Sequence, residues 1–136
     1  KQLTKLRPQS KFLLTNYHRP LFPAVKEVPH QAAVFVPLFE KYNVDLAIES
    51  DGHCIKRTAP IRDGKIDPTG VTYVGEGGLG VGQRQTKPNL WYLKNGYVGR
   101  GHHVYLLNFT ADSLKVDTVL LNGKVEDTFE LKPRNQ

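Results

Sequence analysis

Apolar positions in the first third of the chain predict a strand, a helix and a second strand, in that order. Residues 11–16 (KFLLTN) and 44–50 (VDLAIES) are short apolar runs typical of buried strands. Between them, residues 30–43 carry apolar side chains at helical spacing, and Pro37 is expected to kink this helix or restart it. Together these segments predict a βαβ unit with two parallel strands.

The second half of the chain has a different pattern, in which glycine-containing turns separate short alternating runs. Asn122-Gly123 is a typical hairpin dipeptide, and residues 113–121 and 124–131 flank it with alternating character. We predict an antiparallel hairpin here, with residues 102–109 as its neighbouring strand. The polar tail, residues 132–136, is expected to be frayed. The fold class is therefore α/β, with mostly antiparallel strands in the second half.

The predicted parallel pair does not make a closed domain by itself. Both faces of a parallel pair must be covered, and only one crossover helix is predicted between these strands. The chain also begins at Lys1 and contains no methionine. We therefore expect residues 1–136 to form a single partial domain of a longer chain, whose missing N-terminal half completes it. A trimmed mature protein is the alternative.

Charge and composition narrow the partners that are expected. The net charge is +6, but the Lys and Arg residues are scattered, without a basic run or a nucleic-acid-binding motif. No apolar run approaches the roughly 20 residues that span a bilayer. We therefore expect neither a nucleic-acid nor a membrane partner. The single cysteine, Cys54, excludes an intrachain disulfide and a Cys-rich zinc site, and the compartment stays open.

Histidine and aspartate side chains follow both predicted parallel strands. His18 follows the first strand, and Asp51 and His53 follow the second, with Gly52 between them. Because open α/β sheets bind ligands at the carboxyl edge of their strands, His18, Asp51 and His53 are expected to converge. Imidazole nitrogen and carboxylate oxygen suit zinc, iron or manganese. The alternative is that these are loop side chains bonded to water or backbone.

Three segments of the sequence together resemble a known family: NYHRPLFPA at 16–24, PLFEKYNVDLAIES at 37–50 and DGHCIKRTAPI at 51–61. They are similar to the C-terminal half of calcineurin-like metallophosphoesterases of the purple-acid-phosphatase type. That family carries a His-x-Pro motif, a GHxH motif and a later Gly-rich loop, which GEGGLG at 75–80 resembles. The resemblance implies the C-terminal half of a four-layer α/β/β/α sandwich, with a mixed sheet and an antiparallel C-terminal hairpin. It also suggests a secreted or periplasmic protein.

The resemblance further implies two metal ions (iron, zinc or manganese) and a phosphate ester substrate. His18 and Asp51 would bind one metal ion and His53 the other. His30 is a candidate acid for the leaving group, with an exposed histidine at a helix start as the alternative. Arg19 is a candidate phosphate contact, with a loop anchor as the alternative. Asp51 stands where the family has a histidine, and the family's earlier ligand motifs do not occur in the sequence.

Two functions are consistent with these residues. The first is metal-dependent phosphoester hydrolysis, as a phosphatase or phosphodiesterase, by attack of a metal-activated hydroxide. It is expected of the longer chain, with this stretch alone inactive. The alternative is a non-catalytic binding or structural module on a degenerate metallophosphoesterase fold, which the replacement of histidine by Asp51 favours.

Overall fold

Short strands dominate the computed structural model, which describes residues 1–134. The predicted frayed tail falls partly on residues 135–136, which lie outside the described residues. The helical elements are α1 (Gln2–Leu6), the 3-10 turn η1 (Arg7–Gln9), α2 (Ala32–Lys41) and the 3-10 turn η2 (Trp91–Leu93). The strands are β1 (Leu14–Asn16), β2 (Leu46–Ile48), β3 (Ile55–Arg57), β4 (Ile61–Arg62), β5 (Lys65–Ile66), β6 (Thr72–Gly75), β7 (Tyr97–Gly99), β8 (His103–Phe109), β9 (Leu114–Leu120) and β10 (Val125–Leu131).

The central sheet is mixed, with the strand order β1-β2-β6-β3-β7. Strands β1 and β2 are parallel, with Leu14 opposite Leu46, so the predicted βαβ unit is confirmed. Helix α2 is its crossover, and it runs through Pro37 as one helix instead of restarting there. Strand β6, which the sequence pattern did not predict, is parallel to β2 on its other side. Strands β3 and β7 then add antiparallel pairs.

A second sheet of three antiparallel strands has the order β10-β9-β8. It confirms the predicted hairpin and its neighbouring strand, with a glycine of positive φ (85°) at Gly123 in the turn. A short β4–β5 hairpin turns at Asp63 and Gly64, where both φ values are positive. Period-two alternation therefore located β8, β9 and β10 correctly, whereas β4 and β5 were not predicted.

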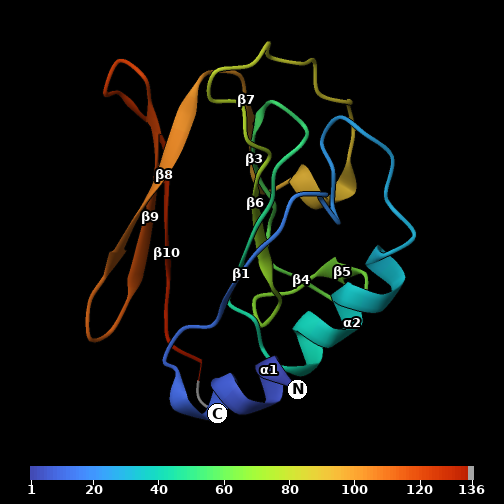
Figure 1. The fold of residues 1–136 in the computed structure, drawn as a ribbon, viewed down its shortest axis with the longest axis vertical. Coiled ribbons are helices and arrows are strands. Elements are labelled where there is room, and N and C mark those ends of the chain that lie inside the picture. Colours follow the sequence, from blue (N-terminus) through green and yellow to red (C-terminus); the bar gives the residue numbers. More distant parts are fainter. Residues whose placement is uncertain (135–136) are drawn as a thin grey trace.

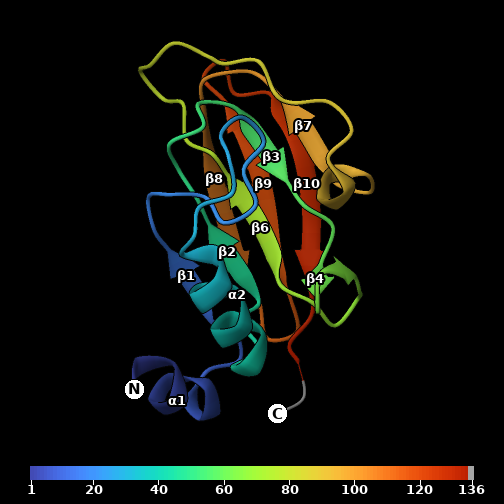
Figure 2. The same cartoon turned by 90° about the vertical axis from the view of Figure 1, so that its right-hand side faces the viewer.

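The described elements form three layers, in which the central sheet has α2 on one face and the second sheet on the other (Figures 1 and 2). Alternation along β2 and β6 divides their side chains between two cores. Ala47 and Tyr73 face the α2 side, with Phe39 of α2 among their neighbours. Leu46 and Val74 face the second sheet and pack with two buried side chains of β9, Leu114 and Val116.

The edge strands of the two sheets lie in pairs on two sides of the molecule (Figure 2). Strands β1 and β8 are the edge strands on one side, and β7 and β10 lie on the other. The rings of Phe12 and Phe109, next to β1 and at the end of β8, are 6.0 Å apart. The described layers are thus α/β/β, which matches part of the predicted four-layer sandwich. The second helical layer is not among residues 1–134.

Helix α2 buries only part of its apolar surface. Phe39 is buried, whereas Val34, Phe35 and Leu38 are exposed at 59%, 45% and 38%. Exposed apolar side chains of this size on one short helix indicate a surface that a further element can cover. Within the described part of the chain, no helix has the length and apolarity to cross a membrane.

Candidate functional site

The loops that follow β1 and β2 meet at the carboxyl edge of the central sheet. His18 follows β1, and its carbonyl oxygen accepts a hydrogen bond of 3.0 Å from the amide of Ser50, just after β2. The His18 Nε2 atom lies 3.6 Å from Oδ1 of Asp51. The parallel pairing of β1 and β2 therefore brings two of the predicted site residues together.

A lysine shares the Asp51 carboxylate. Lys26 Nζ donates to Asp51 Oδ1 at 2.6 Å, the same oxygen that His18 approaches. Arg84 Nη1 donates to the Asp51 carbonyl oxygen at 3.0 Å. The hydrogen bond from Lys26 holds the pKa of the Asp51 carboxyl below its usual range, and the charges of His18 and Arg84 act in the same direction. The carboxylate is therefore ionised and already faces a cation.

Asp51 and His53, on either side of Gly52, both have a backbone in the left-handed region. Their φ values are 72° and 60°, a region that L-residues other than Asn, Asp and His seldom occupy. Gly52 is needed for a different reason, because a Cβ there would overlap the carboxyl group of Glu76 beneath it. Such conformations are typical of functional sites, where the surrounding structure imposes them.

His53 takes partners from the Gly-rich loop and lies apart from the His18–Asp51 pair. Its Nδ1 lies 3.2 Å from the carbonyl oxygen of Gly82, and its own carbonyl accepts from the amide of Arg84 at 3.0 Å. The loop from Gly75 to Gly82 is thus bent over the Asp51–His53 turn, at the sheet edge. Among residues 1–134, no three His, Cys, Asp or Glu side chains form a group that could hold a metal ion.

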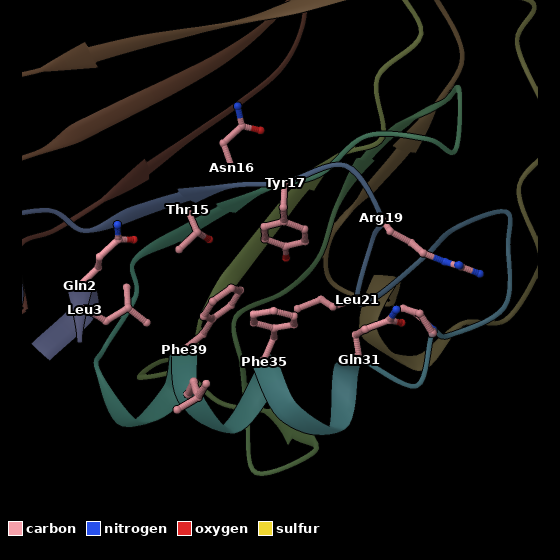
Figure 3. A pocket seen from close by; sticks show the side chains of 12 residues that line it. Gln2, Leu3, Thr15, Asn16, Tyr17, Arg19, Leu21, Gln31, Phe35 and Phe39 are labelled. Carbon is pink, nitrogen blue, oxygen red and sulfur yellow. The ribbon is translucent and has the colours of Figure 1, made fainter.

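The other two predicted residues are exposed near this edge. His30 lies directly before α2, and Arg19 lies one residue beyond His18. Arg19 borders an apolar cavity of about 450 Å³ between α1, β1 and α2, where Phe35, Phe39 and Tyr17 line the wall (Figure 3). Their predicted roles, acid and phosphate contact, remain predictions.

A buried set of three ionisable side chains lies beneath the edge, and sequence reasoning missed it. Glu49, Lys56 and Glu76 are fully buried, and Lys56 Nζ forms an ion pair with Glu49 Oε2 and lies 3.4 Å from Glu76 Oε1. Burial raises the pKa of the Glu76 carboxyl. The sequence offers one signal for it, because Glu49 stands inside the apolar run 44–50, whereas the segments around Lys56 and Glu76 show no periodic pattern.

Nucleophilic catalysis by the single cysteine does not fit this environment. Cys54 is fully buried, and burial raises the pKa of its thiol to about 12. The thiol therefore stays protonated at neutral pH, whereas a nucleophilic cysteine requires the thiolate. The chemistry available at the edge is that of imidazole, carboxylate, ammonium and guanidinium groups.

His18 and Asp51 fit one metal ion as two of its ligands. Their nitrogen and oxygen donors approach within 3.6 Å, and both belong to the donor types of zinc, iron and manganese sites. A site of this kind needs about four ligands, so two more donors must be supplied, and Lys26 must leave the carboxylate. Among residues 1–134, these two donors are therefore too few to hold a metal ion by themselves.

Comparisons with known proteins support the fold. No protein-family model matches the chain, and no curated protein sequence matches it. Its structure is similar to that of purple acid phosphatase PPD1 from seeds of yellow lupin (Lupinus luteus), with a TM-score of 0.81 and 22% identity. The match covers 96% of this chain and 26% of the lupin chain. GAP50, described as the anchor in the inner membrane complex of Plasmodium, matches with a TM-score of 0.76 and 13% identity over 99% of this chain and 41% of GAP50.

These similarities show that the chain has a metallophosphoesterase-like fold of the purple-acid-phosphatase type. The resemblance predicted from the motifs is therefore confirmed at the level of the fold. The chain spans about a quarter of the lupin phosphatase and two fifths of GAP50.

Proposed function

We propose that this chain is the C-terminal part of a metal-dependent phosphoester hydrolase, acting as a phosphatase or phosphodiesterase within a longer polypeptide. The observation that carries the proposal is the approach of His18 Nε2 to Asp51 Oδ1, at 3.6 Å, on two loops that leave neighbouring parallel strands. The metallophosphoesterase-like fold of the chain supports it.

Each residue at the edge has a role in this proposal. His18 and Asp51 would hold one metal ion and His53 a second one, and their imidazole and carboxylate donors suit iron, zinc or manganese. Bound metal ions supply an activated hydroxide and stabilise charge on the phosphoryl oxygens. Arg19 takes a phosphate oxygen through its guanidinium, and His30 gives a proton to the leaving group.

The proposal needs a second polypeptide segment to complete the domain. The edge strand β1 lies beside α2, with which it lines one apolar cavity, and α2 has exposed apolar side chains. An open sheet edge and an apolar helix surface are features that other segments cover in a finished fold. In the proposal, the N-terminal half of the same domain occupies this side and supplies the remaining metal ligands.

Hydrolysis of p-nitrophenyl phosphate and bis-p-nitrophenyl phosphate by the natural full-length polypeptide tests the proposal. Activity should depend on added Mn²⁺, Zn²⁺ or Fe²⁺ and should fall at least about 100-fold in His18→Ala and in His53→Ala, because each variant removes a metal ligand. Lys115→Ala, on the far sheet, is the control and should retain activity. Full activity in both histidine variants would contradict the proposal.

A second candidate is a non-catalytic binding or structural module. The observation that favours it is the ion pair between Lys26 and Asp51, which already neutralises the carboxylate without a metal ion. In this case the full-length protein shows no turnover with any of the three metals, and the histidine variants do not differ from the wild type.

A further inference from the structure

The buried ionisable side chains Glu49, Lys56 and Glu76 contact the two loops that carry the candidate ligands. Lys56 lies between the two carboxyl groups, paired with Glu49 and 3.4 Å from Glu76. Buried ion pairs contribute little net stability, because desolvation of the charges offsets their attraction. Their contacts with the surrounding backbone therefore matter more here than their mutual attraction.

The side-chain hydrogen bonds that leave this set go to one segment, residues 17–24, which contains His18. Glu49 Oε1 accepts from the Tyr17 hydroxyl at 2.6 Å and from the amide of Leu21 at 2.7 Å. Lys56 Nζ donates to the carbonyl oxygen of Phe22 at 2.8 Å. Glu76 Oε1 accepts from the amide of Ala24. The segment has no helix or strand of its own beyond Asn16, so these side chains satisfy its buried backbone groups.

The same set also contacts the turn that carries Asp51 and His53. The Glu76 carboxyl lies directly against Gly52, where a Cβ would overlap it. The backbone of Glu76 accepts from the amide of His53 at 2.9 Å and donates to the carbonyl of Cys54 at 2.8 Å. The buried set is thus in contact with both residues 17–24 and the turn that carries Asp51 and His53.

We infer that Glu49, Lys56 and Glu76 form a positioning cluster that fixes the distance between His18 and Asp51. The inference rests on the proposed function in one respect, since it assigns that distance to metal capture. The three side chains are positioning residues and not metal ligands in this inference. They act through the backbone of residues 17–24 and through Gly52, and they set where the two donors meet.

A matched pair of variants tests the inference, because β2 is flanked by a buried carboxylate at each end. Glu49→Gln alters the positioning cluster, because its amide NH₂ group must face either the Lys56 ammonium or both the Tyr17 hydroxyl and the Leu21 amide, and in each orientation donors face each other. Asp45→Asn alters an equally buried, ion-paired carboxylate at the amino end of β2, which contacts Arg7 and Arg134 instead. Both changes affect stability, and only the first affects residues 17–24.

The readouts are Zn²⁺ affinity by calorimetry on the metal-free full-length protein, and crystal structures of the metal-free variants. Glu49→Gln should lower Zn²⁺ affinity about 10–100-fold, the usual effect of removing a side chain that orients ligands, and Asp45→Asn less than about threefold. The contact between His18 Nε2 and Asp51 Oδ1 should be lost in Glu49→Gln and kept in Asp45→Asn. Equal losses of affinity in both variants, or an unchanged contact in Glu49→Gln, would overturn the inference.

If Glu49→Gln does not fold, Tyr17→Phe tests whether the cluster positions His18 and Asp51. It removes one hydroxyl donor and leaves Glu49 paired with Lys56 and with the amide of Leu21. Zn²⁺ affinity should fall about two- to fivefold and the melting temperature by only a few degrees, in line with the loss of one hydrogen bond. No change would overturn the inference. If the wild type binds no Zn²⁺, the proposed function fails, and the crystallographic distance alone decides whether the cluster positions the loops.

Discussion

Strand β2 is flanked by a buried carboxylate at each end, and the two carboxylates hold different parts of the chain. At the amino end, Asp45 Oδ2 accepts from Arg7 Nη1 at 2.7 Å and from the amide of Leu13 at 2.8 Å, and Oδ1 lies 3.2 Å from Arg134 Nε. At the carboxyl end, Glu49 accepts from Tyr17 and Leu21 and pairs with Lys56.

The partners explain the difference between the two ends. Arg7 follows α1 and Arg134 follows β10, and these two elements end at the same end of the molecule (Figures 1 and 2). Asp45 therefore links an early and a late segment of the described chain through its two arginine partners. Glu49 instead fixes a loop segment next to exposed polar side chains. Two similarly buried carboxylates can therefore differ in role: one links distant segments of the chain, and the other fixes a loop that carries candidate site residues. The segments to which their partners belong decide the role.

The largest loss of stability is expected from Lys56→Met, which removes the cation from the buried set at the carboxyl end of β2. The change leaves two buried carboxyl groups without their cation, and breaking a buried ion pair from one side costs about 3–5 kcal/mol. Urea unfolding followed by circular dichroism measures the loss. Lys115→Met is the control, because Lys115 is half exposed beside Asp117 and such a pair contributes at most about 1 kcal/mol. Similar losses in both variants would show that the carboxyl end is not a tightly coupled buried set.

A smaller effect is expected from Gly52→Ala, which tests the contact between the site turn and Glu76. The added methyl group overlaps the Glu76 carboxyl, and overpacking of this kind costs about 1–3 kcal/mol. The amide signals of Asp51 and His53 should shift in ¹H–¹⁵N spectra. Gly82→Ala is the matched control, since a Cβ at Gly82 meets no atom within 4 Å. A Gly52→Ala protein with wild-type stability and spectra would contradict the contact.

The sequence predicted the strands with clear alternation and the meeting of His18 and Asp51. Period-two patterning and the Asn122-Gly123 turn defined the second sheet, and the βαβ pattern brought the two loops to one edge. Strand β6 was missed because it lies between β2 and β3 and is buried on both faces. Its four residues therefore show no alternation between buried apolar and exposed polar side chains.

The buried charges were missed because hydrophobic patterning assigns charged residues to the surface. Lys56 and Glu76 are 20 residues apart in the sequence, and only the antiparallel pairing of β3 and β6 brings them together. The partner of Asp51 was missed for a similar reason. Lys26 belongs to a loop with three prolines between residues 20 and 29, and no periodic pattern shows where its side chain points.

The smallest expected effect is a loss of folding stability at acid pH. It comes from the second sheet and not from the carboxylates at the two ends of β2. His103 is buried at the start of β8, with Nδ1 at 2.9 Å from the carbonyl oxygen of Gly101. Burial lowers the pKa of the His103 imidazole below its ordinary value, so the unfolded chain takes up a proton before the folded one does. Stability is therefore fully present above the unfolded pKa, near 6.5, and is lost as the pH falls from there toward the folded pKa.

His103→Gln should remove this contribution, because glutamine does not titrate. Between pH 7 and pH 5.5, the free energy of unfolding of the wild type should decline by at most about 1.4 kcal/mol per pH unit from this group, and that of the variant should decline less. Urea unfolding at pH 8, where the imidazole is neutral in both states, gives the reference for each protein. Parallel declines would place the acid sensitivity elsewhere, and the carboxylates at the ends of β2 would then be the groups to substitute.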